Sequence, residues 1–212
     1  MADASQLPRS FQANIARLYE RVLAPVLLSL PVHERLEMGV TDSYEVFLGR
    51  CEAQVDNYTA NEANKVYILV LIALFERQLR IWSAAVFGAA PPVDPQKERF
   101  LKLLDTVSER AGVDIIAAGL RDTLEKAFEI GNVVRHGDGR ASVRLKEIAP
   151  LLFDRSGQQY VDLLPPVPTD SEWMRILPDD VKSIADAIIR YWELADRLPR
   201  PGDHISFKAP VI

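Results

Sequence analysis

Apolar residues recur at intervals of three and four along much of this chain, which is the period of an amphipathic α-helix. In the first such stretch, residues 10–30, the apolar face is made by Phe11, Ile15, Leu18, Val22 and Val26. Pro25 predicts a kink inside this helix, because proline has no backbone N–H to donate. Pro31 is expected to end it.

A second helix is predicted over residues 43–58. The preceding Thr41-Asp42-Ser43 offers a helix N-cap, and Glu45 is placed for a capping box to Asp42. The side chains expected to face the interior are Tyr44, Phe47, Leu48, Cys51 and Val55.

The structural centre of the chain is predicted to be a third helix over residues 61–87, capped by Asn61. Its ten-residue run from Val66 to Phe75 has no polar interruption, so this helix is expected to be buried on all sides. A bilayer span needs about 20 residues, which favours a buried core helix over a membrane anchor.

Two further helices are predicted over residues 95–110 and 114–136, the second with a bend near Gly119. The segment 142–153 fits a short helix or a strand. Residues 151–164 hold two apolar runs around a Ser-Gly turn, which is typical of a small β-hairpin.

Pro178-Asp179-Asp180 begin a C-terminal helix over residues 178–198, since proline suits a first turn and acidic groups suit the positive end of the helix dipole. The chain is therefore expected to be all-α and to form a single domain over residues 1–212. Its core is a bundle of five to six helices, residues 10–140, followed by a hairpin and linker insert, residues 141–170.

Composition adds three limits. The single cysteine, Cys51, excludes an internal disulfide framework and fits a reducing cytoplasm. The N-terminus has no basic segment followed by an apolar one, so no secretory signal is predicted. The net charge of −5 gives no global attraction to nucleic acid. The local charge balance is reversed in residues 131–146. This segment has one acidic residue, Asp138, and the basic residues Arg135, Arg140, Arg144 and Lys146.

Polar chemistry gathers in the stretch from Phe128 to Val143. At 100° per residue, a polar face within about 60° is formed by Glu125, Glu129, Asn132 and His136. A separate apolar stripe is expected to pack on the bundle and comprises Leu120, Leu124, Ala127, Gly131 and Val134. Asn132 and His136 are i,i+4 neighbours and can touch one site together. Arg135 lies near the boundary between the two faces.

This grouping suits phosphodiester cleavage without a metal. A neutral histidine has an ordinary pKa near working pH and can take the proton from a ribose 2′-hydroxyl. An arginine can neutralise the charge that develops on phosphorus, and an amide can orient the phosphate. A histidine before glycine at a helix end also serves simply to cap carbonyls, so both interpretations stay open.

The pattern Asn-x-x-Arg-His-Gly, late in a helix and preceded by an apolar helix whose end carries Glu and Arg, resembles the HEPN superfamily. The resemblance covers about residues 43–145. It implies an all-α bundle, a homodimer with one composite site, and metal-independent endoribonuclease activity giving a 2′,3′-cyclic phosphate. It further implies a role in bacterial toxin–antitoxin or antiphage defence systems, with an antitoxin or defence protein as a possible partner.

The family motif has an arginine four to six residues before its histidine. Asn132 and His136 match this motif, but Gly131 occupies the position of the arginine. Arg135 can substitute from the adjacent position, and Arg77 or Arg80 can reach in from the central helix. The resemblance assigns catalysis to His136, Arg135 and Asn132, and substrate binding to Glu76, Arg77, Arg80, Arg140 and Arg144.

Three functions remain open: an RNA-cleaving HEPN-like enzyme, a catalytically degenerate module that binds RNA, a nucleotide or a partner protein, and an interaction scaffold that docks a partner on the hairpin and final helix. His33 and His204 have no neighbours at metal-ligand spacing, so neither a metal site nor a cofactor is predicted.

Overall fold

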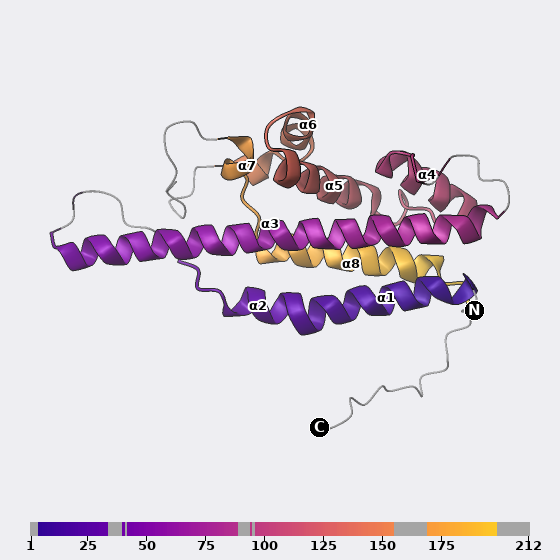
Figure 1. The fold of residues 1–212 in the computed structure, drawn as a ribbon, viewed down its shortest axis with the longest axis horizontal. Coiled ribbons are helices and arrows are strands. Elements are labelled where there is room, and N and C mark those ends of the chain that lie inside the picture. The colour runs from indigo at the N-terminus through magenta and orange to yellow at the C-terminus, as the bar shows by residue number, and fades with distance from the viewer. Residues whose placement is uncertain are drawn as a thin grey trace, which may run out of the picture.

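The fold is arranged along one helix, α3 (Tyr44–Phe87), which has 44 residues and therefore a length of about 66 Å (Figure 1). The computed structural model describes residues 4–33, 40, 42–88, 94, 96–154 and 169–198. In these residues every regular element is a helix, which confirms the all-α prediction.

Besides α3, the elements are η1 (Ala4–Gln6), α1 (Leu7–Leu18), η2 (Tyr19–Leu23), α2 (Ala24–Ser29), α4 (Phe100–Ala111), α5 (Arg121–His136), α6 (Arg140–Ile148), η3 (Pro150–Phe153), α7 (Asp170–Trp173) and α8 (Pro178–Ala195). Helices α1 and α8 run along one side of α3, whereas α4 and α5 lie on another side, with α6 packed on α5 (Figure 1).

The core lies where α3, α4 and α8 meet and is rich in aromatic rings. The Phe75 ring makes edge contacts with Tyr191 and Trp192 at centroid distances of 5.1 and 5.6 Å. Phe100 contacts Phe75 at 6.0 Å and stacks on Phe128 of α5 at 4.7 Å. Edge-to-face and offset rings of this kind add to the stabilisation that burial provides. The apolar face of α8 is thus part of the core.

The predicted second and third helices are one continuous helix. Ser43 is its N-cap, accepting a hydrogen bond from the Val46 N–H at 3.3 Å, so the expected capping box to Asp42 does not form. The prediction that Asn61 caps a separate helix is wrong: Asn61 is buried in mid-helix. Its side chain bonds to a distant segment, so it does not compete for the local backbone and the helix continues.

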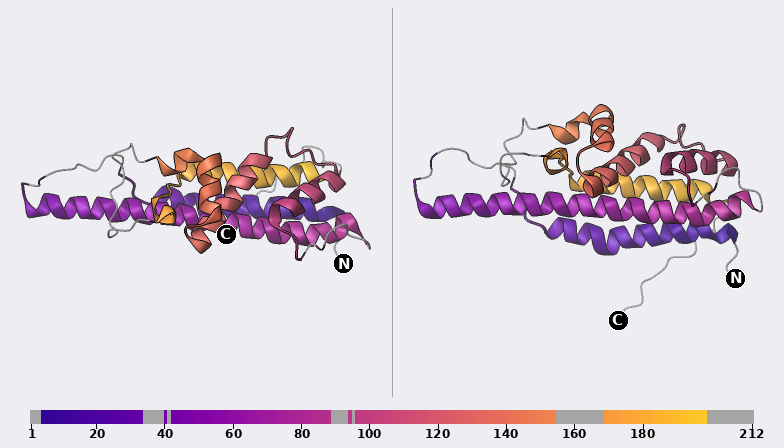
Figure 2. Two further views of the ribbon diagram at one scale, coloured as in Figure 1. Left: turned by 90° about the horizontal axis from the view of Figure 1, so that it is seen from above. Right: turned by 45° about the horizontal axis from the view of Figure 1, so that its top comes forward.

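Four of the five residues expected to face inward at the start of α3 are exposed, whereas the fifth, Cys51, is half-buried. Tyr44, Phe47, Leu48 and Val55 are 73%, 49%, 46% and 51% exposed. The reason is that α3 extends beyond the helices that pack on its second half (Figures 1 and 2). Apolar spacing predicted the helix correctly but could not show where its neighbours end.

A π-helical turn, η2, separates α1 from α2 at the predicted kink. It holds one residue more than an α-turn, so the side chains beyond it are rotated. The buried positions are therefore Leu23 and Leu27, whereas Val22 and Val26 are 48% and 38% exposed, contrary to the predicted stripe.

Two other predicted elements differ. Residues 115–119 form turns rather than the start of a helix, and Gly119 adopts a positive φ of 69° before α5 begins at Arg121. The first arm of the predicted hairpin is the 3-10 turn η3. The rest of that hairpin, residues 155–168, lies outside the described residues.

Among the described residues, no helix combines the length and apolarity needed to cross a membrane.

Candidate functional site

The candidate site lies at the C-terminal end of α5. Gly137 ends this helix with a positive φ of 68°, and its N–H donates to the Val133 carbonyl at 2.8 Å. A glycine is favoured here because residues with a Cβ rarely adopt such a conformation. The following turn leads into α6, so Asn132, Arg135 and His136 lie beside the α5–α6 junction.

Gly131 permits α5 to approach α3 closely. A Cβ added to Gly131 would lie 3.0 Å from Ile72 Cγ2 and 3.7 Å from Leu69 Cδ1. The position where the HEPN motif has its arginine is therefore buried against α3 of the same chain. A long side chain has no room there unless the two helices move apart.

Asn132 and Arg135 form a local clamp along α5. Arg135 donates from Nη2 to Asn132 Oδ1 at 2.8 Å and from Nε to the Gly131 carbonyl at 3.1 Å. Asn132 in turn donates from Nδ2 to Glu129 Oε2 at 3.4 Å. The guanidinium is held beside the amide, and the two groups can contact one anion together.

His136 is exposed. In the described part of the chain its ring makes neither a hydrogen bond nor an ion pair, so it caps no carbonyl of α5. An imidazole in this state can accept a proton from a bound molecule, provided that the molecule itself orients the ring.

Glu129 was placed on the polar face from the sequence but given no role, and in the structure it adjoins Asn132. Burial is the largest cause of the raised pKa of the Glu129 carboxyl, and the negative charge of Glu125 raises this pKa further. The hydrogen bond that Asn132 donates and the positive charge of Arg144 lower it. Asn132 thus connects the clamp to the Glu129 carboxyl group, whose ionised form is destabilised by burial.

The two arginines of this region that were predicted to bind substrate, Arg140 and Arg144, differ from each other. Arg140 is exposed, and among the described residues it has no partner. Arg144 is engaged in ion pairs with Glu125 at 2.8 Å and with Glu147 at 3.2 Å. The hydrogen bond that Arg144 donates to the Glu125 carboxylate is the largest cause of the raised pKa of Arg144. A substrate that binds Arg144 must therefore compete with Glu125.

The three predicted α3 residues lie away from the α5 terminus. Arg80 pairs with Glu76 at 2.5 Å and donates to the Glu98 carbonyl at 3.1 Å, which ties α3 to the segment before α4. Arg77 is exposed and unpaired in the described residues. From Ile72, which faces Gly131, α3 runs towards α4, whereas α5 runs the other way towards His136 (Figure 1). The structure does not bring Glu76, Arg77 and Arg80 to His136.

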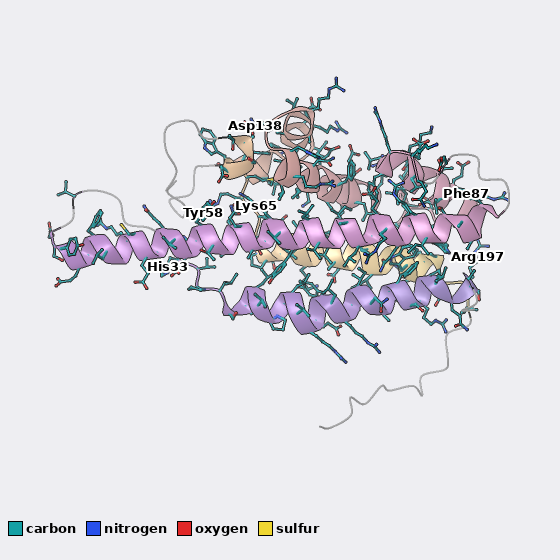
Figure 3. The ribbon with its side chains drawn as sticks, in the orientation of Figure 1. His33, Tyr58, Lys65, Phe87, Asp138 and Arg197 are labelled. Carbon is teal, nitrogen blue, oxygen red and sulfur yellow. The ribbon has the colours of Figure 1, made fainter. Side chains whose placement is uncertain are left out.

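Asp138 fixes the turn after His136 to a segment from elsewhere in the chain. Its Oδ1 accepts the backbone N–H of Asp170 at 2.6 Å and of Ser171 at 3.3 Å, so it caps α7. Lys146 of α6 pairs with Asp170 at 2.5 Å. Figure 3 shows Asp138 above α3, next to α7.

The segment around α7 is also bound to α3. The buried Lys65 donates to the Ser171 carbonyl at 2.8 Å, and the Asn64 amide donates to the Ile176 carbonyl at 2.8 Å. Sequence reasoning missed this role; the available signal was a row of polar residues, Asn57, Asn61 and Asn64, at spacings of four and three on an apolar helix.

A cavity of about 260 Å³ lies on this polar row of α3, lined by Asn57, Asn61, Ile176 and His33 among others. None of the residues that line this cavity belongs to α5 or α6, so the cavity is separate from the α5 terminus.

The described residues contain no group of three or more His, Cys, Asp or Glu side chains that could hold a metal ion. Comparison with known proteins identifies no matching protein-family model, curated protein or solved structure.

Proposed function

We propose that this chain is a HEPN-like, metal-independent endoribonuclease that acts as a homodimer in a bacterial toxin–antitoxin or antiphage defence system. One observation carries the proposal: the exposed His136, which has neither a hydrogen bond nor an ion pair with the described residues, directly follows the clamp of Asn132 and Arg135. A base, a cation and an amide are the groups that metal-free RNA cleavage requires.

In the proposed reaction, a neutral His136 takes the proton of a ribose 2′-hydroxyl. The 2′-oxygen then attacks the adjacent phosphorus while the bond to the 5′-oxygen breaks. Arg135 neutralises the charge on the non-bridging oxygens, and Asn132 orients the phosphate. The leaving 5′-oxygen takes a proton from water, so the products are a 2′,3′-cyclic phosphate and a 5′-hydroxyl.

A second candidate function is a HEPN-like module that binds RNA, a nucleotide or a partner protein without cutting. The burial of Gly131 against Ile72 favours it, because the motif's arginine cannot be accommodated at that position in this packing. Arg135 is also oriented back along α5 by its contacts with Asn132 and Gly131.

A labelled single-stranded RNA distinguishes the two functions. We expect cleavage in the presence of EDTA, products that end in a 2′,3′-cyclic phosphate, and no cleavage of DNA of the same sequence, which lacks the 2′-hydroxyl. His136→Ala should lower the rate by about 10²- to 10⁴-fold, the usual contribution of a general base.

The matched control is His33→Ala, since His33 lies on the other side of α3 and pairs with Asp56 at 2.9 Å. Undiminished cleavage by His136→Ala would refute the ribonuclease mechanism. RNA retention without cleavage would support the binding module.

A further inference from the structure

The cavity on the polar row of α3 lies between two non-helical segments that are far apart in the chain. Residues 30–33, which follow α2, reach α3 because Asn57 accepts the His33 N–H at 2.8 Å and donates to the His33 carbonyl at 2.9 Å (Figure 1). The second segment, residues 174–177, joins α7 to α8 and is bound by the next two asparagines of the row. Together with α3, these segments surround the volume of about 260 Å³.

Five apolar side chains form much of the lining of this cavity: Val32, Ala60, Ile176, Leu177 and Pro178. Ala60 and Ile176 are 6% and 1% exposed and form its inner part. Val32 and Leu177 are 60% and 55% exposed and lie where it meets solvent. A concave lining of this composition favours a ligand with an apolar body.

The charged residues of the lining already have partners. The His33 ring contacts Asp56 Oδ2 at 2.9 Å, and Arg175 also interacts with other groups of the chain. Because neither offers an unpaired charge, an ionised ligand would lose its hydration without gaining an ion pair. The occupant should therefore be uncharged.

One buried polar atom among the lining residues lacks a partner. Asn64 is 3% exposed, and its Nδ2 donates to the Ile176 carbonyl at 2.8 Å. Its Oδ1 is buried and accepts no hydrogen bond within the described part of the chain. By contrast, Asn57 and Asn61 each accept a backbone N–H with the side-chain oxygen. A buried acceptor without a donor is destabilising, which is relieved if a ligand supplies an N–H or O–H group.

Water satisfies such a cavity poorly. A buried water makes about three hydrogen bonds, and a volume of about 260 Å³ holds several waters. Most of them would lie against apolar side chains such as Ala60 and Ile176. Displacement of poorly bound water by an apolar ligand favours binding.

The volume limits the size of the ligand. A cavity of about 150 Å³ can hold one benzene ring, and sites for drug-sized molecules begin at about 300 Å³. We propose that the cavity binds a small, uncharged molecule with two fused aromatic rings and one ring N–H, of which indole is the simplest example. The N–H is donated to Asn64 Oδ1, and the rings lie against Ala60 and Ile176.

NMR titration of the ¹⁵N-labelled full chain with indole tests the site. The Asn61 and Asn64 side-chain amides and the Ile176 backbone amide should shift until saturation. The dissociation constant should be millimolar or lower, as expected for a ligand of so few atoms. The comparison ligand is 1-benzothiophene, which has the same shape but carries sulfur in place of the N–H. It should bind about 5- to 100-fold more weakly, because it leaves Asn64 Oδ1 without a donor.

A variant that fills the cavity locates the binding. Ala60→Leu places three additional carbons in its inner part and should abolish the shifts. Ala73→Leu is the matched control, since it makes the same substitution at an exposed position of α3 and should bind indole as the wild type does. Circular dichroism establishes that both variants keep their helices, and the comparison of the two ligands needs no variant.

Three results overturn the proposal: no saturable shifts with indole, indole binding that survives in Ala60→Leu, or equal binding of indole and 1-benzothiophene. The first would mean that the cavity holds water only, and the third that Asn64 Oδ1 has no part in recognition. The titration contains no RNA, so its result is independent of the proposed ribonuclease activity.

Discussion

Ile176 donates its backbone N–H to the side-chain oxygen of Asn61 at 2.8 Å, although 115 residues separate them in the chain. The Asn61 side chain also donates from Nδ2 to the Met174 carbonyl at 3.1 Å. One buried asparagine therefore satisfies two backbone groups of the segment that leads into α8. This contact connects the middle of α3 to the C-terminal part of the fold.

Asn61→Ala should lower the free energy of unfolding by about 2–4 kcal/mol, because two buried backbone groups lose their partner at about 1–3 kcal/mol each. Urea denaturation of the two proteins measures this difference. Asn14→Ala, at an exposed position of α1, should change stability by less than about 0.5 kcal/mol. A loss at Asn61 no larger than at Asn14 would contradict the assigned contact.

Asn132 and Arg135 should act as one unit in RNA binding. Because Asn132 Oδ1 holds the guanidinium at 2.8 Å, removal of either side chain impairs the other. A double-mutant cycle with Asn132→Ala and Arg135→Ala should give a coupling energy of about 0.5–3 kcal/mol in RNA affinity. Arg17→Ala, which removes the same charge from an exposed position on α1, provides the comparison. Strictly additive effects would argue against the clamp.

Gly131→Arg, which places an arginine where the HEPN motif has one, should not raise ribonuclease activity. It should lower the free energy of unfolding by more than about 3 kcal/mol, since overpacking costs about 1–3 kcal/mol and an unpaired buried charge costs several more. Gly131→Ala is the control: its Cβ would lie 3.0 Å from Ile72 Cγ2 and 3.7 Å from Leu69 Cδ1, both ends of side chains, and it gains about 1 kcal/mol in helix propensity. A stable Gly131→Arg protein with higher ribonuclease activity would disprove this account.

Glu129 should make stability depend on pH. Burial raises its pKa in the folded protein, so the unfolded chain loses this proton at a lower pH than the folded one does. The stabilising contribution is complete below the unfolded pKa and is lost as pH rises through the folded pKa. Glu129→Gln should therefore gain stability relative to wild type between pH 4 and pH 7, measured by urea midpoints.

The reference for this measurement is Glu20→Gln, which removes the same charge from an exposed position on η2. If the difference between wild type and Glu129→Gln is unchanged over this pH range, the burial of the Glu129 carboxyl has no effect on folding.

Local sequence patterns predicted the features of the fold that depend on one helix alone, but not those that depend on which other helices pack against it. The helix predicted over residues 95–110 corresponds to α4, in which Phe100, Leu104 and Val107 recur at helical spacing and are buried. The same kind of spacing at Tyr44 and Phe47 predicted a helix correctly but burial wrongly, because burial depends on where other helices end. The periodicity of apolar residues is a property of one helix, whereas burial requires a second helix packed against it.

The geometry of the candidate site divides in the same way. The proximity of Asn132 and Arg135 follows from helical spacing, since they are three residues apart on α5. The contacts of Asp138 with α7 and of Lys65 with Ser171 join segments 33 and 106 residues apart. No local rule relates such positions, so these anchors could only be found in the folded chain.

The π-helical turn at Tyr19–Leu23 has a consequence for sequence variation. A regular α-turn would direct the Arg21 carbonyl at the ring of Pro25, whereas the wider turn separates them. Deletion of one residue from this turn would keep Leu23 and Leu27 in line with Ile15, but it would restore that clash. The extra residue and Pro25 should therefore be gained or lost together, and a protein with a regular helix here should have neither.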